Sequence, residues 1–207
     1  AFLFSRGFIK TGLGKRIAYN LIAAFGSSSL RLSYALALSD LILAPATPSN
    51  TARVGGVIMP ITTSLAKAFG SEPQDGPRKI GSFLMQSIYQ VNTITSAMFQ
   101  TSMAGNTLVA ALALQSFGIG ITWGDWAMAA IVPGIIALII MPYFIYKVYP
   151  PEIKDAREAQ QMIREELKGL GKMSFQEWVM LGVFVLALVL WATSQFTKID
   201  ATTVAFL

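Results

Sequence analysis

The segment most able to bind a small ion is Ser49-Asn50-Thr51, which follows Pro45 and Pro48 in otherwise apolar sequence. Two prolines within four residues end a helix, because each lacks a backbone N–H donor and restricts the residue before it. Ser49 or Asn50 can then cap the next helix. A helix broken at membrane depth frees carbonyls and amides, and short neutral side chains add oxygens for a cation or donors for a carboxylate. The alternative is that Ser49 and Asn50 only cap a helix.

A second polar cluster comprises Thr95, Ser96 and the run 100–107. Gly105 beside Asn106 predicts a place where a helix unwinds, so that polar atoms of this cluster meet the Ser49-Asn50-Thr51 segment across a cavity. We take Thr95, Ser102 and Asn106 as candidate substrate ligands. The alternative is packing between helices through small residues and Ser/Thr hydrogen bonds.

Asp40 and Arg53 are the only charged residues well inside the segment 32–66. An ionisable residue within a membrane is by default a candidate functional residue. Arg53 can present its guanidinium to a substrate carboxylate, pair with Asp40 or extend to the membrane interface. We interpret Asp40 as structural.

The composition indicates a membrane protein with several spans. Hydrophobic residues make up 54% of the 207 residues and charged residues 13%, against about 25% charged in soluble domains. This excludes a soluble enzyme domain and a disordered tail. The net charge of +5 does not predict a nucleic-acid partner, because the basic residues are separated by long uncharged stretches.

The chain contains no cysteine and no histidine, so the usual nucleophiles, bases and metal ligands are missing. We therefore expect no enzyme and no cofactor. The chain also begins without Met and ends in apolar sequence, which predicts a piece of a longer protein.

Uncharged stretches predict two transmembrane helices, at 124–149 and 175–197. Each contains about 20 uncharged residues, enough to cross one bilayer core. The region 80–117 is too long for one span and rich in polar side chains, so we predict one inward-facing helix broken within it, near 101–106. The region 32–69 has two halves of about 16 residues each, which predicts a re-entrant helical hairpin with its tip near mid-membrane.

Basic residues in the loop 147–172 place that loop on the cytoplasmic side, together with both ends of the hairpin. Two short full spans would satisfy the same sidedness. We predict an amphipathic interfacial segment at 1–31, with Ile17, Leu21, Ala24 and Phe25 on its apolar face, a cytoplasmic linker helix at 152–174, and the start of the next segment at 198–207.

The run from Leu43 to Arg53 resembles the first signature hairpin of the divalent anion:sodium symporters. It is most similar to the subgroup containing bacterial citrate/succinate and tartrate/succinate exchangers and plastid 2-oxoglutarate/malate translocators. Thr11 to Ile17, Ser102 to Ala110 and Trp191-Ala192-Thr193 also resemble that subgroup.

The resemblance implies an all-α integral membrane carrier that works as a homodimer among membrane lipids. It implies an elevator-like motion and two inverted repeats, of which this chain would be the first. Asn50 and Thr51 would meet a substrate carboxylate. Ser49 and Asn50 would contribute to a Na⁺ site, completed by the Pro45 carbonyl and the break around Gly105.

The implied function is transport of di- or tricarboxylates across the bacterial inner membrane, or alternatively the plastid inner envelope. The sequence form Thr-Pro-Ser-Asn-Thr-Ala-Arg favours an exchanger. The alternatives are a sodium-coupled symporter, a channel or a non-transporting membrane scaffold.

Overall fold

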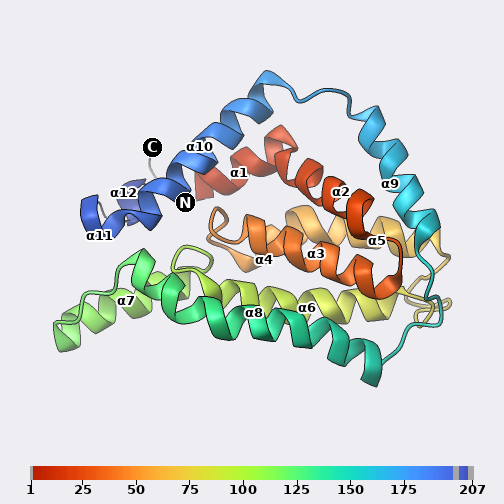
Figure 1. Ribbon diagram of the computed structural model, residues 1–207, viewed down its shortest axis with the longest axis horizontal. Helices are drawn as coiled ribbons and strands as arrows, with labels where there is room; N and C mark the ends of the chain where they lie inside the picture. Colours follow the sequence, from red (N-terminus) through yellow and green to blue (C-terminus); the bar gives the residue numbers. More distant parts are fainter. Residues whose placement is uncertain (1, 198–200, 205–207) are drawn as a thin grey trace.

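The computed structural model describes residues 2–197 and 201–204, and the regular secondary structure of these residues is helical (Figure 1). This confirms the predicted all-α class. The helices in chain order are α1 (Phe2–Thr11), α2 (Leu13–Phe25), α3 (Ser29–Leu43), α4 (Asn50–Arg53), the π-helical turn η1 (Val54–Ile58), α5 (Met59–Ala68), α6 (Gly81–Met98), α7 (Ala104–Phe117), α8 (Trp123–Val148), α9 (Arg157–Gly169), α10 (Phe175–Ala192), α11 (Ser194–Thr197) and α12 (Ala201–Val204). Of the predicted segment 198–207, residues 198–200 and 205–207 lie outside the described residues.

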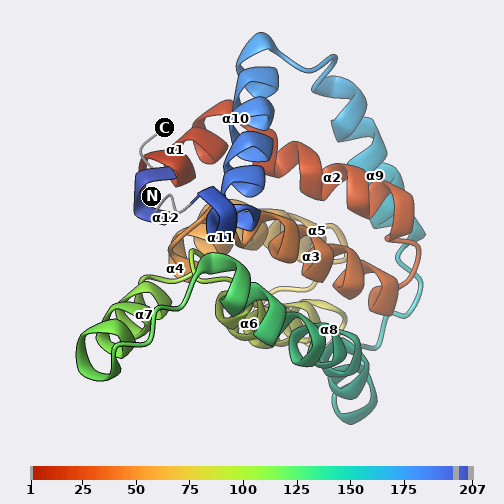
Figure 2. The same ribbon diagram turned by 60° about the vertical axis from the view of Figure 1, so that its left-hand side comes forward.

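The helices form successive layers. In Figure 1, α6 and α8 lie side by side below α3 and α5, α1 and α2 lie above these, and α9 and α10 are outermost. Figure 2 shows the same order from a second direction. Buried apolar side chains from several layers meet in one core, which includes Ile22, Leu36, Phe83 and Trp191.

The predicted hairpin region contains a helix, a turn and a second helical run. The first helix, α3, ends at Leu43, and the second run begins at Asn50. Ser49 caps this run, because its hydroxyl accepts a hydrogen bond from the Ala52 N–H at 3.2 Å. The run continues through α4, η1 and α5 to Ala68, and η1 is a π-helical turn that the sequence analysis did not predict.

The region 80–117 is broken, but at 99–103, between α6 and α7. The prediction that the helix unwinds at Gly105 and Asn106 is wrong, since both residues lie in the first turn of α7. The chain is extended at Phe99 and Met103, and these two residues bound the break. Both views show α7 projecting from the remaining helices (Figures 1 and 2).

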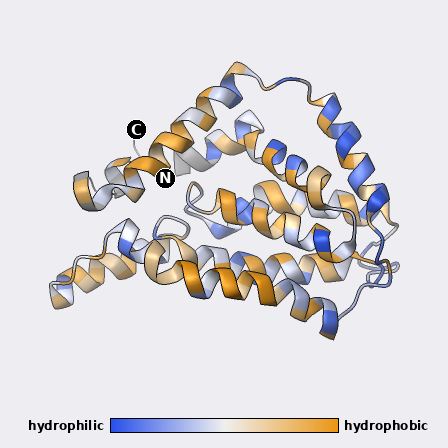
Figure 3. Ribbon diagram, viewed as in Figure 1, coloured by the Kyte–Doolittle hydropathy of each residue, from blue (hydrophilic) through white to orange (hydrophobic). Residues whose placement is uncertain are grey.

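Two helices of the described residues, α8 and α10, are long and apolar enough to cross a membrane, and they match the two predicted spans. Many of their apolar side chains are exposed, among them Ile139, Phe144 and Val185, and much of the ribbon of both helices is orange in Figure 3. Each begins at a capping box, Thr122 with Asp125 and Ser174 with Glu177. Helix α8 continues through Pro133, whereas α10 ends at Ala192, earlier than predicted.

The amino-terminal segment consists of two helices that meet at Gly12, whose φ of 79° favours glycine. Two residues of the predicted apolar face, Ile17 and Leu21, are partly buried against the core, whereas Phe25 is 56% exposed. The fully buried face of α2 includes Leu13, Tyr19 and Ile22. Packing against α3 and α9, rather than the membrane surface alone, selects this face.

The linker helix α9 is attached to the end of α2 by polar contacts. Gln160 and Arg164 both donate hydrogen bonds to the Ala23 carbonyl, at 2.9 Å in each case. The chain before α9 also bonds to the start of α3, because the Ser29 N–H donates to the Lys154 carbonyl. The linker is therefore part of the packed structure.

A buried ion pair joins α2 to the start of α10. The Arg16 Nε donates to the Glu177 carboxylate at 2.6 Å, and Nη1 donates to the Gly171 carbonyl at 2.9 Å. Both side chains are nearly inaccessible. This long-range pair was not predicted from the sequence.

Replacing Arg16 by Ala removes the charged partner of Glu177 and several donors to the carbonyls before α10. We expect the full-length protein to lose about 1–3 kcal/mol of stability, the range for a buried hydrogen bond to a charged group. The thermal unfolding midpoint measures this loss, with the exposed Lys10→Ala as the matched control. Equal midpoints for both variants would contradict a stabilising role for the pair.

Candidate functional site

The two chain breaks lie against each other. The Thr101 hydroxyl, in the break between α6 and α7, donates to the Pro45 carbonyl in the turn after α3 at 2.7 Å. Trp123 holds Thr101 in place, since its indole N–H donates to the Thr101 oxygen at 3.0 Å and its ring stacks on Phe99. The two polar clusters therefore contact each other, as their sequences predict, and the connection is made by Thr101 and Trp123, neither of which was a predicted site residue.

Arg53 and Asp40 form a buried ion pair next to the turn at residues 44–49, which connects α3 to α4. The Arg53 Nε donates to Asp40 Oδ1 at 2.8 Å, and each residue is 1% exposed. Of the three roles considered for Arg53, the structure shows the pairing with Asp40. The prediction that Asp40 is structural agrees with this geometry.

The remaining N–H groups of Arg53 bind both broken segments. Nη1 donates to the carbonyls of Thr47 and Ser102, at 3.1 and 3.3 Å, and Nη2 donates to the hydroxyls of Thr95 and Ser96, at 3.2 and 3.0 Å. A guanidinium has five N–H groups, and these four bonds with the Asp40 contact use all of them. Contact between Arg53 and a substrate carboxylate would therefore require internal bonds to break.

Asp40 accepts further hydrogen bonds through its second oxygen. The Thr95 hydroxyl forms a short bond with Oδ2, and the Asn92 amide donates to the same atom at 3.4 Å. Thr95 is thus placed inside the ion-pair network, buried on α6, rather than in an open cavity. Such saturation is what a buried charge requires, because unpaired charges in a low-dielectric interior are strongly destabilising.

Ser102 and Asn106 satisfy the carbonyls at the end of α6. The Ser102 hydroxyl donates to the Ser96 carbonyl at 2.6 Å, and the Asn106 amide donates to the carbonyls of Ser96 and Phe99 at 2.7 and 2.9 Å. Both side chains are buried. They stabilise the broken helix by replacing the hydrogen bonds that a continuous helix would supply.

Three adjacent predicted site residues, Ser49, Asn50 and Thr51, remain accessible. Ser49 and Asn50 are half-buried and Thr51 is exposed. The Asn50 side-chain oxygen accepts the Thr51 N–H at 2.9 Å, so this loop is ordered by its own side chains. We call Ser49, Asn50 and Thr51 the tip. It presents neutral hydroxyl and amide groups at the N-terminal end of the run 50–68, where the helix dipole favours an anion.

The tip and the break between α6 and α7 contain neutral oxygens of the kind that bind a cation, but they contain no cluster of acidic ligands. Among the described residues, no group of three or more His, Cys, Asp or Glu side chains could hold a metal ion. The Pro45 carbonyl and Ser49 hydroxyl already accept internal hydrogen bonds, although each oxygen has a second lone pair. Gly105 lies near this region in the first turn of α7.

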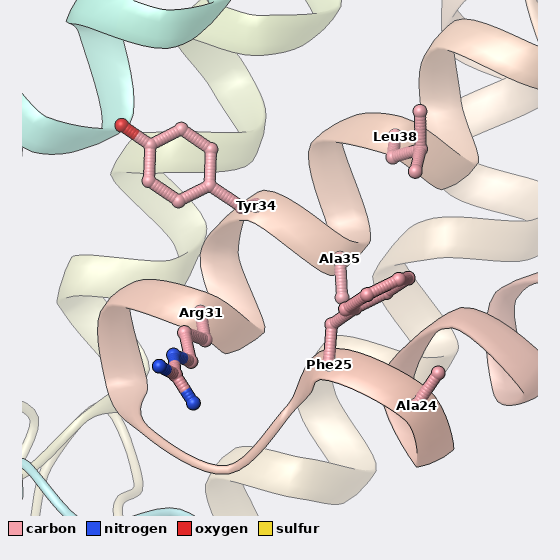
Figure 4. Close-up of a pocket in the computed structure, with 6 residues that line it drawn as sticks. All are labelled: Ala24, Phe25, Arg31, Tyr34, Ala35 and Leu38. Atoms are coloured by element: carbon pink, nitrogen blue, oxygen red, sulfur yellow. The ribbon is translucent and has the colours of Figure 1, made fainter.

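A groove lies beside the first half of α3, away from the tip. It has a volume of about 520 Å³, and its lining residues are Ala24, Phe25, Arg31, Tyr34, Ala35 and Leu38. Figure 4 shows the Tyr34 ring extending toward the neighbouring ribbon, where its hydroxyl donates to the Ile139 carbonyl at 2.5 Å. The groove is mainly apolar and shares no residue with the tip or the ion-pair network.

Several members of the network were not predicted as its partners. Asn92, Ser96 of the predicted polar cluster and the Thr47 carbonyl all bind Asp40 or Arg53 directly. A sequence signal for the pair itself existed, because Asp40 and Arg53 are two opposite charges isolated in an uncharged stretch. Their polar partners carry no comparable signal, since Ser, Thr and Asn are common along the whole of α6.

Replacing Arg53 by Gln leaves the Asp40 carboxylate buried without its partner. We expect a loss of about 3–5 kcal/mol in stability, the range for breaking one half of a buried pair. Thermal unfolding of the full-length protein measures this loss. The double variant Asp40→Asn/Arg53→Gln should recover part of it, because the unpaired charge is gone.

The exposed Arg157–Asp155 pair provides a matched control. Arg157→Gln should leave the unfolding midpoint unchanged, since both side chains are solvated. A double variant as unstable as the sum of the two single variants would show that Asp40 and Arg53 are not energetically coupled.

The whole chain, residues 1–207, matches the family described as the sodium:sulfate symporter transmembrane region. It is 54% identical over its full length to YflS of Bacillus subtilis (strain 168), which is named for malate transport, and covers 44% of that protein. It is 47% identical over its full length to chloroplastic dicarboxylate transporter 1 of Spinacia oleracea, covering 37%. It is 40% identical over 92% of its length to the L-tartrate/succinate antiporter of Escherichia coli (strain UTI89), covering 39%.

The chain therefore spans less than half the length of these relatives. All three are named as transporters or antiporters of carboxylates, in agreement with the resemblance of the tip sequence. Since the family match extends over all 207 residues, the chain belongs to the sodium:sulfate symporter transmembrane family, the divalent anion:sodium symporters predicted from the tip motif.

Proposed function

We propose that the full-length protein is a secondary active transporter of di- or tricarboxylates, of the succinate, malate, 2-oxoglutarate and citrate class, and that it works by anion exchange. The names of the relatives support the substrate class. The observation that carries the proposal is the accessible tip. The buried Asp40–Arg53 pair supports it, because Arg53 donates a hydrogen bond to the Thr47 carbonyl, two residues before the tip. The tip offers hydrogen-bond donors without a net charge, so a carboxylate can bind and still be released.

In this proposal, Asn50 and Thr51 contact the substrate carboxylate, and Ser49 contacts it or positions the helix that does. Arg53 is a positioning residue, because its bonds to Thr47 and Ser102 fix both broken segments relative to each other. The partial positive charge that attracts the substrate carboxylate then comes from the N-terminal end of the run 50–68, rather than from a buried arginine.

We further propose that this chain forms the first of two inverted repeats, with α3, the turn and the run 50–68 as a hairpin re-entering from the cytoplasmic side. The support is that the relatives are more than twice as long as the chain. The second part would complete the substrate site, and two copies would form an elevator-type homodimer in the bacterial inner membrane, or alternatively the plastid inner envelope.

Sodium-coupled symport is the second candidate. The family description names sodium. Oxygens of Ser49, Asn50 and Pro45 lie in and just before the tip, and Gly105 lies in the first turn of α7, after the break that contacts Pro45. Neutral oxygens of this kind suit Na⁺, but the internal hydrogen bonds of Pro45 and Ser49 favour exchange without a cation.

Counter-flow in proteoliposomes separates the two candidates. We expect uptake of labelled succinate by the full-length protein to require unlabelled succinate inside and to ignore external sodium. Uptake that needs a sodium gradient but no internal substrate would establish symport. Conduction that does not saturate with substrate would instead indicate a channel.

Variants of the tip separate substrate binding from helix capping. Ser49→Ala removes both the hydroxyl and the cap, whereas Ser49→Gly removes the hydroxyl at a cost of only a few tenths of a kcal/mol in capping. If the hydroxyl binds substrate, both variants should lower succinate transport by about tenfold, the loss expected for one charged hydrogen bond. Asn50→Ala and Thr51→Ala should raise the KM similarly.

Thr93→Ala is the control, because Thr93 is exposed on α6 and its hydroxyl donates to the Tyr89 carbonyl of its own helix. Its transport rate should be that of the unmodified protein. Normal transport by Ser49→Gly together with loss in Ser49→Ala would assign Ser49 a capping role only.

A further inference from the structure

A second cavity lies away from the tip, where α1, α2, α9 and the run 50–68 come together. Its volume is about 320 Å³, which is at the lower end of the range for ligand pockets. One wall is apolar and consists of Ile9, Val57, Pro60 and Ile61. The lining also includes the polar residues Lys15, Tyr19 and Glu166.

The two charged groups at this cavity face each other without being closely paired. Lys15 Nζ lies 3.6 Å from Glu166 Oε2, and the two side chains are 46% and 47% exposed. An ion pair this exposed is weak and exchanges readily with other partners. The Tyr19 hydroxyl donates to the same Glu166 oxygen at 3.0 Å, which fixes the carboxylate in position.

Lys15 remains charged at every physiological pH. Its hydrogen bond to Tyr19 raises its pKa above the ordinary value, and the nearby Glu166 acts in the same direction against the opposing effect of burial. A positive and a negative group thus both line the cavity. A ligand with one phosphate and one ammonium complements both groups and adds no net charge.

The apolar wall indicates that this ligand is a lipid rather than a free aminophosphate. Ile9 and Pro60 are exposed at the cavity, and the neighbouring Met59 is exposed as well, so apolar surface continues from the cavity to the outside. An acyl chain would cover this surface, whereas a small polar molecule would leave it in water. The chain belongs to a transmembrane family, so the full-length protein is in contact with lipid.

We propose that this cavity binds the headgroup of an ethanolamine phospholipid, with the phosphate on Lys15, the ammonium on Glu166 and an acyl chain along Ile9 and Pro60. An ethanolamine ammonium has N–H donors for the carboxylate, whereas a choline headgroup has none. A glycerol headgroup would carry a net negative charge toward Glu166. The cavity wall includes Val57 of η1, the turn that directly follows Arg53, so the bound lipid supports the helix that carries the tip.

The test uses the full-length protein in vesicles of phosphatidylethanolamine, phosphatidylcholine and phosphatidylglycerol in equal parts. After mild extraction, native mass spectrometry measures which lipids remain bound. We expect phosphatidylethanolamine to be retained on the order of tenfold more than phosphatidylcholine, as one hydrogen bond to a charged group predicts. Equal retention of the two, or preferential retention of phosphatidylglycerol, would overturn the proposal.

Two variants assign the headgroup contacts. Glu166→Gln should reduce phosphatidylethanolamine to the level of phosphatidylcholine, and Lys15→Gln should reduce both, because both have the phosphate. The controls Glu165→Gln and Lys168→Gln change the same charges at exposed positions of α9 that do not line the cavity. Retention that is unchanged in Glu166→Gln, or equally reduced in Glu165→Gln, would contradict the assignment. This readout does not depend on transport, so it is independent of the proposed function.

Discussion

The buried ion pair between Arg53 and Asp40 is the interaction on which the arrangement of the two broken helices depends. A charge pair out of water is stable only when every remaining donor and acceptor is satisfied. The partners of this pair come from α3, the 44–49 turn, the run 50–68, α6 and the break after α6. Satisfying one guanidinium and one carboxylate therefore fixes five segments relative to one another.

The residues of this buried network stabilise the fold, whereas the residues of the tip are left accessible. Polar groups that meet the ion pair or the free carbonyls of α6 are buried and occupied, as Thr95, Ser102 and Asn106 are. The tip lies outside that network, so its groups remain available to a ligand. In the proposed transporter, the strong charges hold the scaffold and a neutral surface contacts the carboxylate. Substrate binding then need not break a buried salt bridge.

The peripheral helices are held by a second set of polar contacts. Arg16 joins α2 to the start of α10, and α9 is bonded to the end of α2. The proposed lipid cavity lies among these helices and contacts the run that begins at the tip. Lipid composition and tip geometry would thus be connected through η1.

The sequence alone determined the helical class, the two helices that are long and apolar enough to cross a membrane, the interruption before Ser49 and the family, because proline chemistry and long uncharged stretches are local signals. It located the second break only within a few residues, since Gly105 permits unwinding but α6 already ends at Met98. Which face of α2 is buried, and which polar residues surround Arg53, were decided by the tertiary structure. Buried charges take partners from whichever helices pack around them, and that choice depends on three-dimensional proximity rather than on spacing along the chain.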